Sequence, residues 1–129
     1  MTVALANNVA STLAVDLSST AGSLTLATGT GARFPTTVGG QYYYATLVAP
    51  SGVLEIVKVT GRTGDLLTVT RGAEGTIPNG FTAGARVELR ITAQSVLDAV
   101  ADGVATVGIA VGTVPPENPA INTLWVDTN

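Results

Sequence analysis

The sequence predicts a mainly β fold: a small antiparallel β-sandwich or barrel-like domain of hairpins, with one short C-terminal helix and an extended Pro-rich arm. The β domain is predicted by short segments in which apolar and polar residues alternate, separated by turns that contain glycine or proline. The helix is predicted by a change of apolar spacing after Ile91, from every second residue to every third or fourth. We therefore expect a β-rich module over residues 1–91, a helix over 92–106 and an extended arm over 107–129.

Composition limits the functions that this chain can have. The net charge is −3 and Lys58 is the only lysine, so nucleic-acid binding has little electrostatic support. The chain has no cysteine and no histidine, which removes disulfides, thiolate chemistry, the usual general base and the commonest metal ligand. No apolar run reaches the roughly 20 residues of a membrane span, and residues 1–10 lack the features of a signal peptide. We expect no membrane contact, no export and, with only 12% charged residues, a surface largely covered by protein partners.

The first strands of the module are expected to form a hairpin. Leu13, Val15 and Leu17 alternate with polar or small residues, as in a half-buried strand. Residues 23–27 repeat the alternation after a polar turn at 18–22, so the two segments are predicted to pair with each other.

A second hairpin is predicted in the middle of the chain. A strand over 53–60, a turn over 61–65 and a returning strand over 66–71 follow one another directly. The alternation of the first strand shifts phase around Val57 and Lys58, which a β-bulge or a two-sided strand would explain.

Two further strands flank this hairpin in sequence. Residues 42–49 begin with three consecutive tyrosines and are expected to form a fully buried or interface strand. Residues 85–91 alternate, with Arg86, Glu88 and Arg90 on one face, and these charges are expected to pair across neighbouring strands.

The helix is expected to start at Thr92, a good N-cap residue. Its apolar residues recur at helical spacing: Ala93, Val96, Leu97, Val100, Ala101 and Val104. The residues on its other face are Gln94, Ser95, Asp98 and Asp102.

The helical segment has a second interpretation as a coiled-coil seam. Apolar residues keep a three–four spacing over about three heptads, at Ala93, Leu97, Val100, Val104, Val107, Val111 and Val114. However, Gly103, Gly108 and Gly112 are poor helix formers, and no charged pairs flank the seam. A short helix followed by an extended arm is therefore preferred. The arm contains Pro115, Pro116 and Pro119 before Leu124 and Trp125, which predicts docking on the chain's own module or on a neighbouring subunit.

No constellation for catalysis can be assembled from these residues, and no catalytic, cofactor-binding or metal-binding residue is expected. Glu55 and Glu74 are the least implausible carboxylate pair, but nothing in their spacing favours a glycosidase site. Serine and threonine are plentiful without an activating base. The glycine-rich residues 72–76 lack the lysine and the following helix of a phosphate-binding loop.

Three segments together resemble tail-appendage and tail-fibre-associated structural proteins of tailed bacteriophages. They are NNVASTLAVDLSSTAGSLTLATGTGARFP (7–35), EIVKVTGRTGDLLTVTRGAEGT (55–76) and FTAGARVELRITAQSV (81–96), in continuous order over roughly residues 6 to 97. The resemblance implies a β-rich, N-terminal, fibre-anchoring module on the tail side, followed by helical or fibrous parts. The ending PPENPAINTLWVDTN resembles segments of phage fibre proteins, but it is not followed by a long fibre, which favours an anchor or adaptor.

This resemblance implies a virion protein assembled in the host cytoplasm, which binds other tail proteins and tail fibres without a cofactor. We expect a homo-oligomer, a trimer or a symmetric ring. Arg71 and Glu74 frame a glycine turn and are expected to pin that loop. The expected interface residues are Tyr42, Tyr43, Tyr44, Leu97, Val100, Val104, Leu124 and Trp125. The alternative function is receptor or glycan binding at the tail tip, in which the three tyrosines or Trp125 would stack on sugars.

Overall fold

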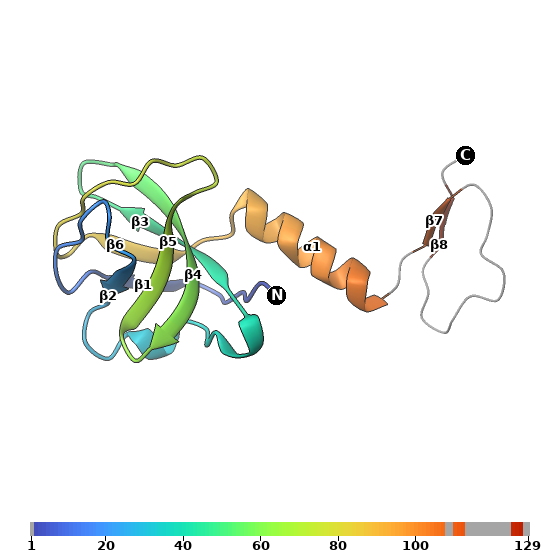
Figure 1. The fold of residues 1–129 in the computed structure, drawn as a ribbon, viewed down its shortest axis with the longest axis horizontal. Helices are drawn as coiled ribbons and strands as arrows, with labels where there is room; N and C mark the ends of the chain where they lie inside the picture. Colours follow the sequence, from blue (N-terminus) through green and yellow to red (C-terminus); the bar gives the residue numbers. More distant parts are fainter. Residues whose placement is uncertain (1, 108–109, 113–124, 128–129) are drawn as a thin grey trace.

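The computed structural model describes residues 2–107, 110–112 and 125–127, with side chains described as far as residue 103. Most of these residues fold into a curled antiparallel sheet, from which helix α1 (Ala93–Val107) projects (Figure 1). The predicted mainly β class with a short helix is therefore confirmed. Most of the predicted Pro-rich arm lies outside the described residues, and its short strands β7 (Ala110–Gly112) and β8 (Trp125–Asp127) pair in parallel.

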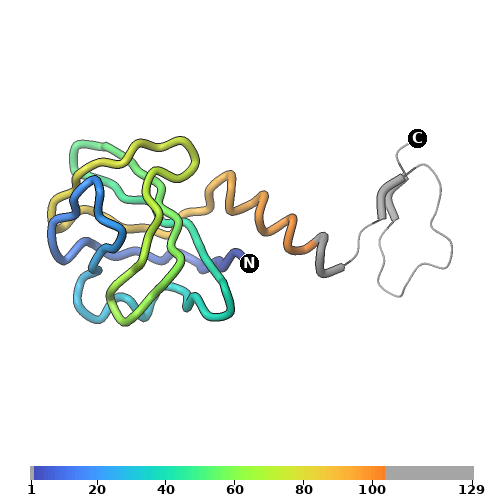
Figure 2. The backbone as a smooth tube through the Cα atoms, viewed as in Figure 1, coloured from blue at the N-terminus to red at the C-terminus, as the bar shows by residue number. Residues whose placement is uncertain are grey.

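The curled sheet has six strands, and every neighbouring pair is antiparallel. In spatial order they are β1 (Val9–Thr12), β6 (Arg86–Leu89), β3 (Tyr43–Val48), β4 (Leu54–Thr63), β5 (Leu66–Ala73) and β2 (Ser23–Thr25). A bridge between Leu13 and Leu26 joins the chain just beyond the two edge strands. The backbone trace shows this curl, which gives the module its barrel-like shape (Figure 2).

The predicted central hairpin is confirmed as β4 and β5. Its register shifts between Ile56 and Lys58, where the sequence pattern changes phase, and again between Val59 and Gly61. The phase change in the sequence therefore coincides with an irregularity in the pairing of β4 with β5, as a bulge would produce.

The predicted first hairpin is present only in part. The segments around Leu13 and Leu26 meet in an antiparallel bridge, where the Ala14 amide donates to Thr25 and the Ala27 amide to Thr12. The longer strands beside this bridge have other partners, since β1 pairs with β6 and β2 pairs with β5. Leu13 and Leu17 are buried, as their alternation indicates, and their amides donate to the carbonyls of Ala85 and Phe81.

The expected cross-strand pairing of charges on β6 is wrong. Glu88 forms ion pairs with Arg86 and Arg90 of its own segment. Its partners across the sheet are Ala10 and Thr46, which carry no charge. Residues two apart on a strand point to the same face, so one carboxylate is shared by two arginines and the group keeps a net positive charge.

The three consecutive tyrosines divide between two faces of the sheet because successive strand residues point to opposite sides. Tyr43 enters the main core inside the curl, where its ring stacks on Phe34 with the ring centroids 6.3 Å apart. Tyr42 and Tyr44 lie on the outer face with Val3, in a second and smaller apolar cluster that includes Ala99 of α1. This outer cluster is where the helix meets the module.

The loop before β3 is held against the β4–β5 turn. It contains two short 3₁₀ helices, η1 (Gly31–Arg33) and η2 (Val38–Gly40). The carboxylate of Asp65 accepts hydrogen bonds from the amides of Gly29 and Gly31, at 2.9 and 2.8 Å.

Across the described residues, no helix has the length and apolar character needed to cross a membrane.

Candidate functional site

Helix α1 follows β6 after a short connection and begins with a reciprocal cap. The Thr92 hydroxyl accepts from the Ser95 amide at 3.2 Å, and the Ser95 hydroxyl accepts from the Thr92 amide at 2.8 Å. The predicted cap at Thr92 is therefore confirmed. Glu74 adds a further acceptor for the first turn, because its carboxylate takes the Gln94 amide at 3.0 Å.

One carboxylate of the helix is bound by two tyrosines of the sheet. Asp98 Oδ2 accepts from the hydroxyls of Tyr42 and Tyr44 at 2.7 and 3.0 Å, and Asp98 Oδ1 accepts from Gln94 Nε2 at 2.8 Å. The bond from Tyr42 is the largest cause that lowers the pKa of Asp98. Burial, followed by the bond to Asp98, raises the pKa of Tyr44 to about 12. Asp98 is thus held as a carboxylate between two neutral phenols.

A second carboxylate binds the N-terminal segment. Asp102 Oδ2 accepts from the Val3 amide at 3.0 Å, one helical turn beyond Asp98. Lys58 lies over the Tyr42 ring, with its ammonium 4.2 Å from the ring centroid. The polar side of α1 is therefore fastened to both β3 and the start of the chain, which fixes the direction and the rotation of the helix.

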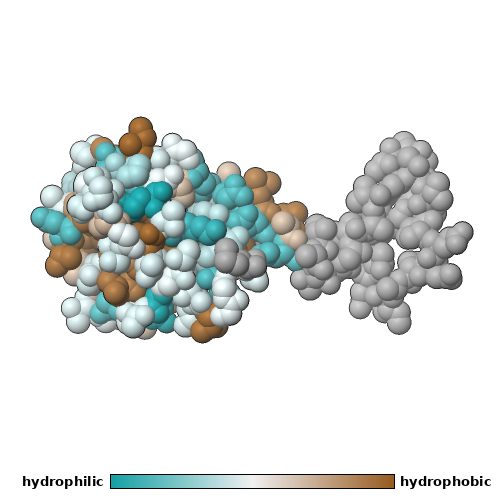
Figure 3. All heavy atoms as spheres, in the orientation of Figure 1, coloured by the Kyte–Doolittle hydropathy of each residue, from teal (hydrophilic) through white to brown (hydrophobic). Residues whose placement is uncertain are grey.

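The opposite side of α1 is apolar and exposed. Val96, Leu97 and Val100 are 48%, 62% and 59% exposed. Between residues 93 and 103, the exposed positions are Ala93, Val96, Leu97, Val100, Ala101 and Gly103, and none of them is polar. We call these six residues the outward face of α1; part of it is visible as brown side chains on the helix in Figure 3. A surface helix ordinarily turns its apolar side toward its own core, so this arrangement is reversed.

The apolar surface continues onto the module at the base of the helix. A hollow of about 390 Å³ is lined there by residues that include Leu54, Ile56, Ile91 and Ala93. Leu54 and Ile91 are themselves exposed. Ala93 belongs to both the hollow and the outward face, so the two adjoin each other. The lining of the hollow is mixed, because it also contains Thr46, Glu74, Arg90 and Thr92.

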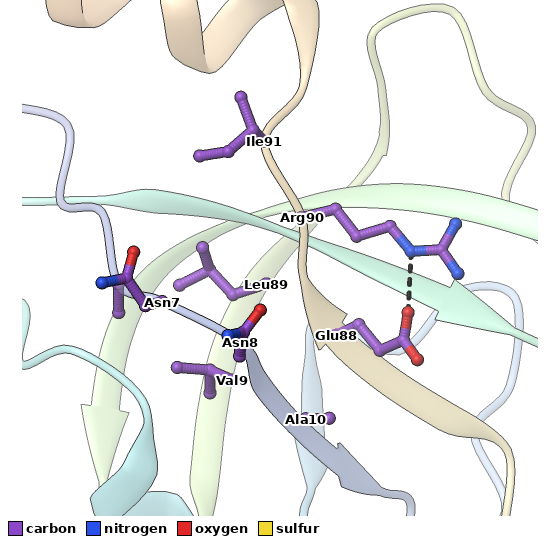
Figure 4. A pocket seen from close by; sticks show the side chains of 9 residues that line it. Asn7, Asn8, Val9, Ala10, Glu88, Leu89, Arg90 and Ile91 are labelled. Atoms are coloured by element: carbon purple, nitrogen blue, oxygen red, sulfur yellow. Dashed lines mark hydrogen bonds and ion pairs between the residues drawn. The ribbon is translucent and has the colours of Figure 1, made fainter.

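A second hollow, of about 500 Å³, lies beside β1 and the end of β6 (Figure 4). Asn7 and Asn8 line it from the segment before β1, and Glu88 and Arg90 line it from the other side. The Glu88 carboxylate is occupied by the ion pair with Arg90, at 2.7 Å, and by the pair with Arg86. The one carboxylate in the lining of this hollow is therefore engaged by two arginines, and it is not free to act as a nucleophile or a base.

Arg71, which was expected to pin its loop, forms a buried ion pair with Glu55. Nε and Nη2 of Arg71 donate to Oε1 and Oε2 of Glu55, both at 2.8 Å, and the two side chains are 8% and 0% exposed. Glu55 also accepts from the amides of Gly72 and Asn79, at 3.0 and 3.1 Å. Burial opposes ionisation of Glu55, but the bonds from Arg71 and the two amides outweigh it and lower its pKa.

Arg71 also donates to the carbonyls of Ser18, Ala21 and Asn79. It therefore joins the loop after β5 to the turn before β2. Glu74 is not its partner, since Glu74 binds the first turn of α1. The carboxylates of Glu55 and Glu74 are thus engaged in separate structural contacts.

The other expected interface residues fall into three groups. Tyr42, Tyr43 and Tyr44 are 8%, 0% and 7% exposed, so their rings pack within the chain and offer no stacking platform. Leu97 and Val100 lie on the outward face of α1. Val104, Leu124 and Trp125 have side chains outside the described residues, although the backbone of Val104 is helical and that of Trp125 lies in β8.

Sequence reasoning missed the residues that orient the helix. The sequence predicts Asp98 and Asp102 on the polar face of the helix, but it does not show what they bind, and nothing in it points to Val3. The available signal was the pair of tyrosines two residues apart on one strand face, together with two carboxylates one turn apart on the helix. That pattern shows which groups share a face, but it does not show that the two faces meet.

The comparisons with known proteins add no identification. No protein-family model matches the sequence, and a search of curated proteins finds no match. Within residues 2–103, whose side chains the structure describes, no three acidic groups come together as a possible metal site.

Proposed function

We propose that this chain is a structural protein of a tailed-bacteriophage virion, which anchors tail fibres or other appendages to the tail through protein–protein contacts. The proposal takes its viral context from the three segments within residues 6–97 that resemble tail-appendage proteins. It takes its mode of action from the geometry of α1.

The observation that carries the proposal is the reversed orientation of α1. Asp98 and Asp102 are directed toward the module, whereas Val96, Leu97 and Val100 are exposed, so apolar side chains are left in water. Exposed apolar surface of this kind marks a protein-interaction site when it is contiguous. The hollow lined by Leu54 and Ile91 extends the same surface onto the module. The chain is therefore built to be covered by protein.

The arrangement suits a connector with two ends. The module over 1–91 is a curled sheet with a continuous core, and it is proposed to attach to the tail. The helix projects from this module in a fixed direction, and it is proposed to engage the neighbouring appendage (Figure 1). The bonds of Asp98 to Tyr42 and Tyr44 and of Asp102 to Val3 tether the helix to the module. Because this tether is already formed in the single chain, little conformational freedom is lost when the partner binds.

A catalytic role is not proposed. Glu55 is enclosed with Arg71, so it is not presented to a substrate. Receptor or glycan binding at the tail tip has no supporting observation among the side chains that the structure describes, because the three tyrosines that would stack on a sugar are buried.

The experiment that tests the proposal is immunogold electron microscopy on purified virions of the phage that encodes the chain. Antibodies raised against residues 1–91 are expected to label the tail at a constant position, and capsids prepared without tails provide the control. Absence of the chain from intact and from disrupted virions, checked by mass spectrometry, would contradict the proposal.

A further inference from the structure

We infer that α1 is a self-association helix, and that three copies of the chain pack their outward faces together in parallel. This deepens the proposed function and rests on it for its biological setting, because it names the first partner of the exposed surface as a second copy of the same chain. The assembled helices would form a short three-stranded bundle, with the β modules arranged around one end.

The distribution of charge on α1 favours identical copies as the occupant. In a parallel symmetric bundle each central residue meets its own copies, so a charge there would face like charges. Between residues 93 and 103 the outward face carries no charge. The two carboxylates of that stretch, Asp98 and Asp102, are held on the opposite side by Tyr42, Tyr44 and Val3. A partner of different sequence would not require this separation.

The spacing of the apolar residues is that of a helical bundle. Leu97 and Val100 are three residues apart, and Ala93 precedes Leu97 by four. These intervals make Leu97 an a position, with Ala93 and Val100 at d positions. The sequence continues the same spacing at Val104 and Val107, and the helix extends to Val107.

The choice of side chains favours three strands over two. In parallel dimers the preferred d residue is leucine, whereas β-branched residues at d with leucine at a shift the preference to trimers or tetramers. Here Leu97 occupies an a position and Val100 a d position. The expected product is therefore larger than a dimer, and the trimer that we infer is the smallest assembly that meets this preference.

The module leaves room for this packing. α1 projects from the sheet (Figure 1). The carboxylates that bind the module, Asp98 and Asp102, are not among the exposed residues of the outward face. The hollow beside Leu54 and Ile91 lies where the N-terminal end of a neighbouring helix would approach the module. Packing would thus cover apolar surface on both the helix and its base.

The first test is the mass of the full chain in solution, measured by sedimentation over a range of concentrations up to about 1 mM. Val100→Glu places a charge on the outward face, and Val38→Glu is the matched control, since Val100 and Val38 are 59% and 69% exposed. The wild type and Val38→Glu are expected to be trimeric, and Val100→Glu monomeric. Circular dichroism checks that each variant is folded.

Two outcomes overturn the inference. A wild-type chain that stays monomeric over the whole concentration range excludes self-association. This holds also if residues 108–129 of the same chain are what cover the helix. An oligomer that Val100→Glu leaves intact places the contact elsewhere.

The second test addresses the parallel orientation. The chain has no cysteine, so Leu97→Cys introduces a single thiol at an a position. In a parallel bundle two such thiols lie side by side and form a disulfide between chains on mild oxidation, whereas Val38→Cys is expected to remain reduced. A trimer in which Leu97→Cys fails to cross-link contradicts the parallel arrangement.

The two proposals fail in different ways. A chain that is found in the tail of the virion but is monomeric keeps the structural role and removes the self-association. A trimer that requires Val100 but is absent from virions keeps the self-association and removes the phage tail role.

Discussion

Arg71 and Glu55 face each other in a bidentate ion pair, with two nitrogen–oxygen distances of 2.8 Å, enclosed beneath the loops that follow β5 and precede β2. The pair satisfies its hydrogen-bonding groups with backbone atoms from three separate segments, through Ser18, Gly72 and Asn79. The pair therefore holds together loops that have no regular secondary structure of their own.

Arg71→Met is expected to destabilise the chain by about 3–5 kcal/mol, because it leaves the Glu55 carboxylate buried without a counter-charge. Urea unfolding, followed by far-ultraviolet circular dichroism, measures the change in the free energy of unfolding. Arg90→Met is the control, since Arg90 is 45% exposed in its ion pair with Glu88, and it is expected to cost at most about 1 kcal/mol. Equal effects of the two substitutions would contradict the structural role of the buried pair.

The stability contributed by Glu55 is expected to disappear in acid. The pKa of Glu55 is lowered in the folded chain, so its contribution is present above the unfolded value of about 4.3 and is lost as the pH falls through the folded value. Glu55→Gln is therefore expected to be less stable than the wild type at neutral pH, with a difference that narrows below about pH 4. Urea midpoints over a pH series measure this difference. A constant difference down to about pH 2 would refute the assignment.

The tyrosines under α1 are expected to report on the helix tether at alkaline pH. The pKa of Tyr44 is raised to about 12, so the stability from its neutral hydroxyl is complete below the unfolded value of about 10 and is lost as the pH rises toward 12. Asp98→Asn removes the negative charge beside Tyr44 and is expected to shift the phenolate absorbance titration to lower pH. Hydrogen exchange of the α1 amides should also become faster. The control is Asp16→Asn, because Asp16 binds the Ala83 amide and no tyrosine hydroxyl. An identical phenolate titration in both variants would contradict the bond between Asp98 and Tyr44.

Gly31 is expected to accept no side chain. A Cβ atom at this position would lie 2.0 Å from the Gly64 carbonyl oxygen, so Gly31→Ala must displace backbone in the loop that Asp65 holds. We expect a loss of about 1–3 kcal/mol in the free energy of unfolding. Gly22→Ala is the matched control, since a Cβ there meets nothing within 4 Å, and its effect is expected to be small. Equal stability of the two variants would contradict the close approach.

The parts of the fold that could be predicted from the sequence are those set by neighbouring residues. The β4–β5 hairpin has both strands, its turn and its bulge within one continuous stretch, and the cap at Thr92 depends on residues three apart. The pairing of β1 with β6 was not predictable in this way, because it joins residues that are far apart along the chain, such as Val9 and Leu89. The alternation around Leu13 correctly indicated burial, but it carried no information about the partner strand.

The candidate site shows the same division. Apolar periodicity identified Leu97 and Val100 as members of one helix face, and the structure places both on the outward face. Periodicity alone does not say which side of a helix faces its own domain. That was decided by Asp98, Asp102 and their partners on β3 and at Val3, which only the three-dimensional arrangement brings together.

The tether of α1 also sets an order of events. Val3 meets Tyr42 and Tyr44 only when the outer face of the sheet has formed, because Val3 lies far from both tyrosines along the chain. Before that, the bonds from the two tyrosine hydroxyls to Asp98 and from the Val3 amide to Asp102 are not in place. The angle between the helix and the sheet is therefore defined only in a chain whose own sheet is complete.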